Sequence, residues 1–230
     1  RPRRAGGMTG PRVVPGGRTQ PAVDVSVVVP ARDEADALPL LVPRIRGALE
    51  ALDLRWECVV VDDGSVDGSV EVLRSIVTAE PRVRALRLAG RQGKSAALAC
   101  GIAEARGRYL VLMDADLQDL PEEIGLLLAP LLAGELDLTQ GRRIDRQDTP
   151  WKRLASAVFN RLCSAASGLR VHDVNCGYKA MRAEVARRIR LDEGLHRFIP
   201  VLAWRLGFRV DEVPVRHASR AFGRSRYGPL

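Results

Sequence analysis

The sequence predicts an α/β domain built on a mostly parallel β-sheet with helices on both faces. From residue 25 onward, short runs of apolar and β-branched residues alternate with longer segments that have helical spacing. The apolar runs are continuous, as expected for parallel strands that are buried on both sides. Polar residues follow three of these runs, so candidate site residues stand at strand ends.

The first half of the chain contains five predicted strands separated by four predicted helices. Pro39 and Pro121 suit the first turn of their helices, where the missing N–H has no helical partner to lose. Pro43 is expected to weaken or bend the first helix. The strands are expected over residues 25–29, 57–61, 83–88, 109–113 and 136–140. The helices are expected over residues 38–52, 69–79, 94–106 and 121–133.

The second half has a weaker pattern. Thr149 and Pro150 are typical of a helix start, and the segment that follows is amphipathic. This helix either packs on the sheet or lies on a membrane surface. The remaining elements are expected to be a helix over 151–167, a strand over 177–181, a helix over 196–206 and a strand over 208–215.

Composition limits the classes of partner. The formal net charge of +8 favours anionic partners, such as nucleic acid, anionic lipid or a phosphorylated substrate. We expect no nucleic-acid partner, because only 4% of the residues are aromatic and no recognition motif is present. The four cysteines form no C-x-x-C pair and no zinc pattern, which indicates buried thiols in a reducing cytosol. No apolar run is long enough to predict a helix that spans a membrane.

One short acidic stretch, "MDADLQD" at residues 113–119, carries the clearest chemical signal. Asp114 and Asp116 are two residues apart at a strand end, so their side chains leave the same face. Together with Gln118 they suit Mg²⁺ or Mn²⁺. A D-x-D pair alone also fits a polar turn that caps the next helix.

Two other strand ends are polar, "PARDE" at 30–34 and "DDGS" at 62–65. Carboxyl ends of parallel strands meet at one edge of a sheet, so the three ends together indicate a pocket there. The segment "GRQGKS" is not a P-loop, because Leu88 stands where its first glycine would be.

Five segments occur in a characteristic order: "VSVVVPARDE", "VVVDDGSVDGS", "GKSAALACGIAEARGRYLVLMDADLQDLPE", "NCGYKAMR" and "RAFGRSRYG". Together they resemble the inverting family 2 glycosyltransferases over residues 25–228. More narrowly, they resemble the dolichyl-phosphate and polyprenyl-phosphate hexosyltransferases. The resemblance implies a GT-A-type, Rossmann-like fold and an enzyme that uses Mg²⁺ or Mn²⁺.

The resemblance also implies roles for matching positions. The residues implied to bind the donor are Pro30, Arg32, Glu34, Val61, Asp63, Asp114, Ala115, Asp116, Arg143, Arg220 and Arg226. Those implied to bind the metal ion are Asp114, Asp116 and Gln118. Those implied to bind the acceptor are Arg143, Lys152, Arg153 and Ser156. Asp116, Arg143 and Arg220 are expected to act directly in catalysis. Arg220 and Arg226 match the basic pair of a mobile loop that closes over the donor. The family often has Tyr in place of Arg32 and Lys in place of Arg226.

The implied reaction moves a hexose from a nucleotide sugar of the GDP-mannose or UDP-glucose type to dolichyl or polyprenyl phosphate, with inversion. The enzyme would work in the cytoplasm at the cytosolic face of the membrane. Residues 24–230 would form the catalytic domain after a disordered basic arm, residues 1–23. Within the domain, 24–143 would bind the nucleotide sugar and 144–230 the acceptor. Membrane helices often follow the "SRYG" position in the resembled subfamily, so we expect such a segment outside this chain.

Two alternatives stay open. A family 2 transferase that acts on a sugar hydroxyl or a protein would need a catalytic base, for which Asp173 and Glu193 are candidates. A non-catalytic module that binds nucleotide sugars at a membrane would lack a metal or diphosphate ligand, and every expected ligand is present. His196 is either structural or part of the acceptor side.

Overall fold

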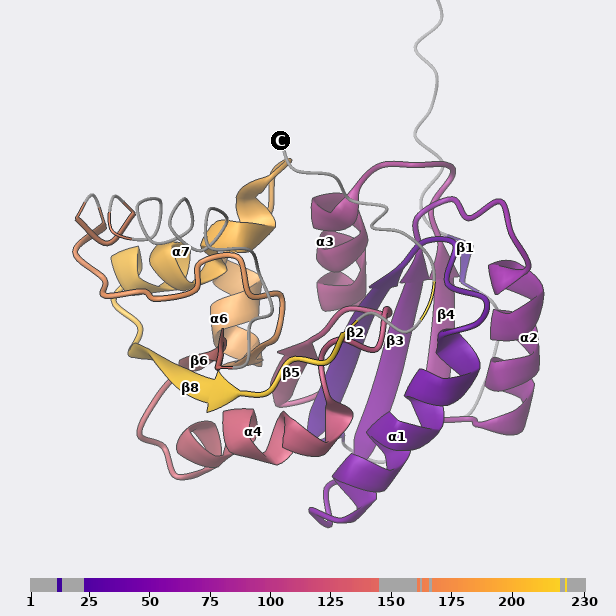
Figure 1. Ribbon diagram of the computed structural model, residues 1–230, viewed down its shortest axis with the longest axis horizontal. Coiled ribbons are helices and arrows are strands. Elements are labelled where there is room, and N and C mark those ends of the chain that lie inside the picture. Colours follow the sequence, from indigo (N-terminus) through magenta and orange to yellow (C-terminus); the bar gives the residue numbers. More distant parts are fainter. Residues whose placement is uncertain are drawn as a thin grey trace, which may run out of the picture.

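The computed structural model describes residues 12–13, 23–144, 161, 163–165, 167–219 and 222. Within these residues the strands form one eight-stranded sheet in the order β1-β4-β3-β2-β5-β7-β6-β8 (Figure 1). The strands are β1 (Arg12–Val13), β2 (Val25–Ala31), β3 (Trp56–Asp62), β4 (Val83–Arg87), β5 (Tyr109–Leu112), β6 (Leu138–Arg143), β7 (Lys179–Arg182) and β8 (Val210–Val215). The helices are α1 (Leu38–Glu50), α2 (Ser69–Ala79), α3 (Lys94–Glu104), α4 (Ile124–Leu132), α6 (Ala183–Arg188) and α7 (Ile199–Arg205), with 3₁₀ turns η1 (Pro121–Glu123) and η2 (Leu195–Phe198).

Strand direction decides which residues meet at the functional edge of the sheet. Strands β2, β3, β4 and β5 are mutually parallel, and β6 and β8 run in the same direction. Strand β7 is antiparallel to both of its neighbours, β5 and β6. The edge that carries the carboxyl ends of β2, β3, β5 and β6 therefore also carries the amino end of β7.

The core lies on both faces of this sheet. On one face α1, α2 and α4 pack against alternate strand residues such as Val27 and Val29. On the other face α3, α6 and α7 pack against residues such as Val28, Leu110 and Leu112. Helix α1 faces the sheet because its buried residues recur at helical spacing: Leu38, Leu41, Val42, Ile45 and Leu49. Truncating one such side chain to Ala typically costs about 2–5 kcal/mol of stability.

A glycine brings α3 into close contact with the sheet. A Cβ on Gly101 would lie 2.4 Å from Val28 Cγ1 and 3.1 Å from Val61 Cγ2, so no larger residue fits without a shift. Glycine is unfavourable inside a helix, and here the close packing of α3 on β2 and β3 explains it. This packing fixes the helix that begins at Lys94, a residue of the site.

The predicted fold class is confirmed, with local corrections. Helix α6 was not predicted, because six residues are too short to show a helical period. Residues 12–13 fall within the predicted disordered arm, yet they pair with the open edge of β4 as strand β1. The helix predicted over 121–133 begins with a 3₁₀ turn, and the strand predicted over 136–140 runs from Leu138 to Arg143. Of the predicted amphipathic helix over 151–167, residues 151–160, 162 and 166 lie outside the described residues.

The four cysteines are free thiols, as the sequence predicts, and Cys58 and Cys176 are buried. Among the helices that the structure describes, none is both long and apolar enough to cross a membrane.

Candidate active site

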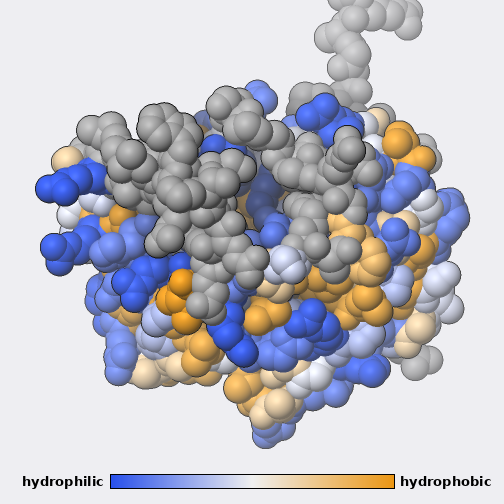
Figure 2. Space-filling view, in the orientation of Figure 1, coloured by the Kyte–Doolittle hydropathy of each residue, from blue (hydrophilic) through white to orange (hydrophobic). Residues whose placement is uncertain are grey.

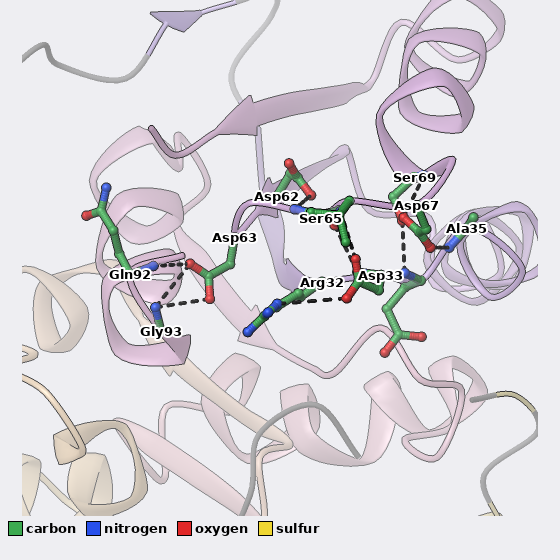
Figure 3. Close-up of polar contacts among 12 residues, drawn as sticks. Arg32, Asp33, Ala35, Asp62, Asp63, Ser65, Asp67, Ser69, Gln92 and Gly93 are labelled. Carbon is green, nitrogen blue, oxygen red and sulfur yellow. Dashed lines mark hydrogen bonds and ion pairs between the residues drawn. The ribbon is translucent and has the colours of Figure 1, made fainter. Parts of the chain in front are cut away.

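The loops that follow β2 and β3 hold each other through hydrogen bonds (Figure 3). The backbone N–H of Asp33 donates to Ser65 Oγ at 2.8 Å, and the N–H of Glu34 donates to Ser69 Oγ at 2.9 Å. The hydroxyls come from the turn "DDGSVDGS" and the N–H groups from "PARDE". These contacts fix the backbone of Arg32 and Glu34, whose side chains line the cavity described below.

Arg32 presents a buried donor to this cavity. Its Nε has no hydrogen-bond acceptor within the part of the chain that the structure describes, and its closest acid is Asp33, with Nε and Oδ2 3.9 Å apart. Buried polar groups in proteins nearly always have a hydrogen-bond partner. Arg32 therefore lines the cavity as a cationic side chain whose hydrogen-bonding capacity is not fully used within the described residues.

Asp63 and Val61, two predicted donor-binding residues, do not line the cavity. The Asp63 carboxylate is buried and accepts hydrogen bonds from the N–H groups of Gln92 at 2.6 Å and Gly93 at 3.0 Å. Val61 is fully buried in a cluster with Leu86 and other apolar side chains. Asp63 thus holds the loop that leads into α3, and a donor-binding role for either residue stays a prediction.

The cavity, about 360 Å³ in volume, opens at the carboxyl edge of the sheet. Near it, Figure 2 shows hydrophilic surface recessed beside α3. Its walls come from the ends of β2, β5 and β6, the amino end of β7, the start of α3 and η2. The lining residues are Pro30, Arg32, Glu34, Lys94, Asp114, Ala115, Asp116, Gln118, Asp119, Arg143, Asn175, Cys176, Gly177, Lys179, His196, Arg197 and His217. The structure therefore brings together the predicted residues Pro30, Arg32, Glu34, Asp114, Ala115, Asp116, Gln118 and Arg143.

Residues 114–119 form a compact acidic turn after β5. Asp119 Oδ2 accepts a hydrogen bond from the N–H of Asp114 at 3.1 Å, and Asp116 Oδ1 accepts one from the N–H of Gln118 at 3.1 Å. Leu117 has a φ of 63°, in the left-handed region, which bends the chain back on itself. The turn places three carboxylates on one cavity wall.

The carboxylates of this turn differ in ionisation. Lys94 Nζ lies 2.5 Å from Asp114 Oδ1 and 2.7 Å from Oδ2. Burial opposes ionisation of Asp114, but the ammonium of Lys94 outweighs it and lowers the pKa of this carboxyl. Burial and the adjacent charge of Asp114 raise the pKa of Asp119 to about 7. Asp114 is therefore an anion at neutral pH, whereas Asp119 is close to half-protonated.

The predicted metal ligands fit a divalent cation only in part. Asp114 and Asp116 face the same cavity, but the side-chain amide of Gln118 donates from Nε2 to the Ala218 carbonyl at 3.3 Å. The described residues contain no group of three or more His, Cys, Asp or Glu side chains that could hold a metal ion. Mg²⁺ commonly binds through one or two carboxylates and takes its other ligands from water and substrate phosphates. The donor set matches that mode and not an all-protein cage.

Arg143, at the end of β6, is held rigidly by Asp173. Its Nε lies 2.6 Å from Asp173 Oδ2 and its Nη2 lies 2.8 Å from Oδ1. Asp173 is itself fixed, since its N–H donates to Glu212 Oε1 and its carbonyl accepts from Gln140 Nε2. Although burial alone would lower the pKa of Arg143, the ion pair raises it above the ordinary value. Asp173 therefore orients an arginine in the cavity, a role that its position in a turn could not reveal.

Lys179 and His196 complete the cavity, and Lys179 was not among the predicted site residues. Lys179 is 2% exposed, and its ammonium donates to the Cys176 carbonyl. Burial lowers the pKa of Lys179 to about 8. His196 Nδ1 lies 2.9 Å from Ser95 Oγ, and burial with the nearby charges of Lys94 and Lys179 lowers its pKa to about 4. The sequence signal for Lys179 was a lysine inside the otherwise apolar strand "GYKAM".

The predicted residues Lys152, Arg153, Ser156, Arg220 and Arg226 lie outside the described residues. Their roles in acceptor binding and donor closure stay predictions.

The sequence profile of Glycosyl transferase family 2 matches residues 26–190. The chain belongs to this family. The match covers the loops after β2, β3 and β5, together with Arg143, Asp173 and Lys179, so the cavity is that of a family 2 glycosyltransferase domain.

Two bacterial relatives of this domain are longer proteins. The chain is 36% identical over 213 residues to a dodecaprenyl-phosphate galacturonate synthase of Rhizobium johnstonii, covering 90% of this chain and 62% of the relative. It is 35% identical over 205 residues to an undecaprenyl-phosphate 4-deoxy-4-formamido-L-arabinose transferase of Aeromonas hydrophila, covering 89% of this chain and 63% of the relative. The chain thus spans less than two thirds of the length of these relatives.

Solved structures with the same fold include glucosyl-3-phosphoglycerate synthase from Mycobacterium tuberculosis. Its complex with phosphoglyceric acid aligns with a TM-score of 0.67 and 23% identity, covering 87% of this chain and 73% of the other. Its complex with Mn²⁺ and uridine-diphosphate-glucose aligns with a TM-score of 0.66 and 22% identity, covering 87% and 72%. At this identity the likeness establishes the GT-A-type fold.

Proposed function

We propose that this family 2 glycosyltransferase domain transfers a sugar from a nucleotide sugar to a polyprenyl phosphate, with inversion and with Mg²⁺ or Mn²⁺. The observation that carries the proposal is the shared cavity, in which the carboxylates of Asp114 and Asp116 and the guanidinium of Arg143 stand on adjoining walls. Acids suit a metal-bound diphosphate, and a rigid arginine suits a second phosphate. Two relatives with polyprenyl-phosphate names support the acceptor class.

The donor is a nucleotide sugar whose diphosphate enters between the loops after β2 and β5. GDP-mannose and UDP-glucose are the types implied by the family resemblance, and the names of the relatives add galacturonate and a formamido-arabinose. Arg32 lines the β2 side of the cavity with a cationic side chain, and Asp114 and Asp116 stand on the β5 side. Leaving-group charge develops on the diphosphate, where preorganised cations and donors stabilise it.

Asp114 and Asp116 would hold the metal ion, which when bound supplies a Lewis acid that neutralises charge on the diphosphate. A related fold solved with Mn²⁺ and uridine-diphosphate-glucose supports this choice of metal. The chain's own contribution is to fix the two carboxylates. Asp116 Oδ1 accepts a hydrogen bond from the N–H of Gln118, and Asp119 holds the backbone of Asp114, so the acidic turn is fixed before any ligand arrives.

Arg143 is proposed to bind the acceptor phosphate. Its bidentate pair with Asp173 fixes the plane of the guanidinium, so its remaining N–H groups face a defined direction. A lipid phosphate is ionised at neutral pH and needs no general base to attack the anomeric carbon. Attack from the side opposite the departing diphosphate inverts the anomeric configuration.

A hydroxyl acceptor is less well supported by the geometry. Asp173, one expected base for that reaction, is committed to Arg143, and Glu193, the other, does not line the cavity. A hydroxyl nucleophile must lose a proton to a group within hydrogen-bond reach. Both base candidates expected from the sequence are therefore poorly placed for this reaction.

The test is a transfer assay with two acceptor classes. The purified chain is incubated with Mn²⁺, a panel of UDP- and GDP-sugars and either a polyprenyl phosphate in vesicles or an oligosaccharide, and products are identified by mass spectrometry. We expect glycosylated polyprenyl phosphate from at least one donor. Product formed only on the oligosaccharide would overturn the proposed acceptor.

A further inference from the structure

The ion pair between Lys94 and Asp114 occupies both oxygens of a proposed metal ligand. Lys94 Nζ lies 2.5 Å from Oδ1 and 2.7 Å from Oδ2. The lysine side chain is 13% exposed and lines the same cavity as Asp114 and Asp116. In the metal-free chain an ammonium thus stands where a divalent cation would take its carboxylate.

This pair is built into the fold from both sides. On one side Asp63 holds the N–H groups of Gln92 and Gly93, and α3 begins at the next residue, Lys94. On the other side the amino end of β7 leaves room for the pair. A Cβ on Gly177 would lie 3.2 Å from Asp114 Oδ2 and 3.3 Å from Lys94 Nζ.

The pair and a bound metal ion compete for the same atoms. An ammonium that donates to both oxygens of Asp114 takes up a lone-pair site on each, and its charge repels the cation. Metal binding is therefore favoured by displacement of Lys94, which is costly unless the lysine finds a new anionic partner in the cavity. A nucleotide diphosphate is such a partner, and it also supplies the metal ligands that the chain does not.

We propose that Lys94 is the exchangeable counter-ion of Asp114, which it leaves for the diphosphate when the metal ion and the nucleotide bind together. The inference rests on the metal site of the proposed function. The exchange makes metal binding and diphosphate binding depend on each other, and this coupling is reciprocal. In the absence of nucleotide, Lys94 keeps Asp114 occupied and holds metal affinity low.

The test measures Mn²⁺ affinity directly, by electron paramagnetic resonance of free Mn²⁺. Wild type and Lys94→Met are titrated with Mn²⁺ alone, with Mn²⁺ plus UDP and with Mn²⁺ plus GDP. For Lys94→Met we expect Mn²⁺ alone to bind roughly 10-fold more tightly, within the usual range of coupling between sites. The gain in Mn²⁺ affinity on adding nucleotide should shrink by a similar factor.

Three variants separate exchange from a general effect of charge. Lys179→Met removes an ammonium from the same cavity, and in the described structure Lys179 donates to the Cys176 carbonyl and not to Asp114. Lys179→Met should change Mn²⁺ affinity less than Lys94→Met does. The gain in Mn²⁺ affinity on adding nucleotide should remain as in wild type. Lys94→Arg keeps a cation beside Asp114 and should keep low Mn²⁺ affinity. Lys94→Gln repeats the test if Lys94→Met unfolds, as judged by its thermal transition.

Three outcomes of the Mn²⁺ titrations would contradict the proposal, each for a different reason. Equal Mn²⁺ affinity for wild type, Lys94→Met and Lys94→Gln overturns the exchange and leaves the metal site standing. An equal rise in Mn²⁺ affinity for Lys179→Met and Lys94→Met also overturns the exchange, because loss of any positive charge in the cavity would then explain the rise. Absence of Mn²⁺ binding in every protein, with and without nucleotide, removes the metal site itself and the exchange with it.

Discussion

Two polar clusters at the same edge of the sheet satisfy their charges in opposite ways. The loop cluster (Asp33, Asp62, Asp63 and Asp67) accepts hydrogen bonds from backbone N–H groups of its own and neighbouring loops (Figure 3). The cavity cluster (Lys94, Asp114, Asp119, Lys179 and His196) consists of ionisable side chains that act on one another's charge. Aspartate occurs in both clusters, so the residue type alone does not tell how its charge is satisfied.

The difference shows which acids hold the fold and which serve the chemistry. A carboxylate that accepts backbone N–H groups fixes a loop, as Asp63 does. Burial, together with neighbouring charges, displaces the pKa values of ionisable groups in the cavity, to about 7 for Asp119 and about 8 for Lys179. Such displaced pKa values are typical of functional sites. Mutations in the two clusters should therefore separate loss of stability from loss of activity.

The largest effect is expected from Asp116→Ala, which lies in the same cavity and the same acidic turn as Asp114 and Asp119 of the cavity cluster. Removing a ligand that helps to stabilise the leaving group should lower the transfer rate by about 10³-fold, with little change in the thermal midpoint. The measurement is steady-state transfer in Mn²⁺ alongside thermal unfolding. Asp67→Ala in the loop cluster is the matched control and should retain most activity. Near-normal turnover of Asp116→Ala would contradict the metal assignment.

Substitution of Arg143 should reduce transfer activity more than substitution of Asp173. Arg143→Met removes the proposed phosphate ligand and should cost about 10²–10³-fold in kcat/KM for the acceptor. Asp173→Asn leaves the arginine but loosens its orientation, which typically costs about 10–100-fold in activity at supporting positions. Titration of both variants with acceptor checks the order. If Asp173→Asn is the more damaging variant, Asp173 does more than orient Arg143.

In the loop cluster, Asp63→Ala should act mainly on stability. It leaves the N–H groups of Gln92 and Gly93 without their acceptor, which costs about 1–3 kcal/mol for buried donors. Denaturant unfolding measures this loss. Asp36→Ala, at an exposed position, is the control and should change stability by less than about 0.5 kcal/mol. A stable Asp63→Ala without activity would instead support the predicted donor contact.

The smallest effect is a pH dependence from His196. Its folded pKa of about 4 lies below the unfolded value of 6.5, chiefly because of burial. Between these values the unfolded state binds more protons, so His196 favours the folded state above pH 6.5 and loses that contribution as pH falls toward 4. His196→Gln should therefore flatten the fall in thermal midpoint over this window. Parallel curves for wild type and variant would show that His196 is not buried in neutral form.

Much of the fold was readable from the sequence because burial imposes periodicity. The runs 25–29, 57–61 and 109–113 are mostly apolar and do not alternate with polar residues, as expected for strands covered on both faces. The direction of β7 was not readable, since the same apolar run suits either orientation. Helix α6 was too short to carry a period.

The structure brings Asp114, Asp116, Arg32, Glu34 and Arg143 to one cavity, because they follow strands whose ends share an edge. Their roles in binding and catalysis stay predictions. Lys179 was not predicted, because it enters the cavity from the amino end of an antiparallel strand. The Asp63 carboxylate turned out to hold a loop, because only the folded chain brings Gln92 and Gly93 beside it.

The sequence by itself determined the alternating elements, the acidic turn after β5 and membership of family 2, because these depend on residue order and local spacing. The tertiary structure alone decided the partners of each charge. Lys94 is 20 residues from Asp114, and Arg143 is 30 residues from Asp173. Such pairs form when strand order and helix packing bring distant segments together, and no local pattern specifies them.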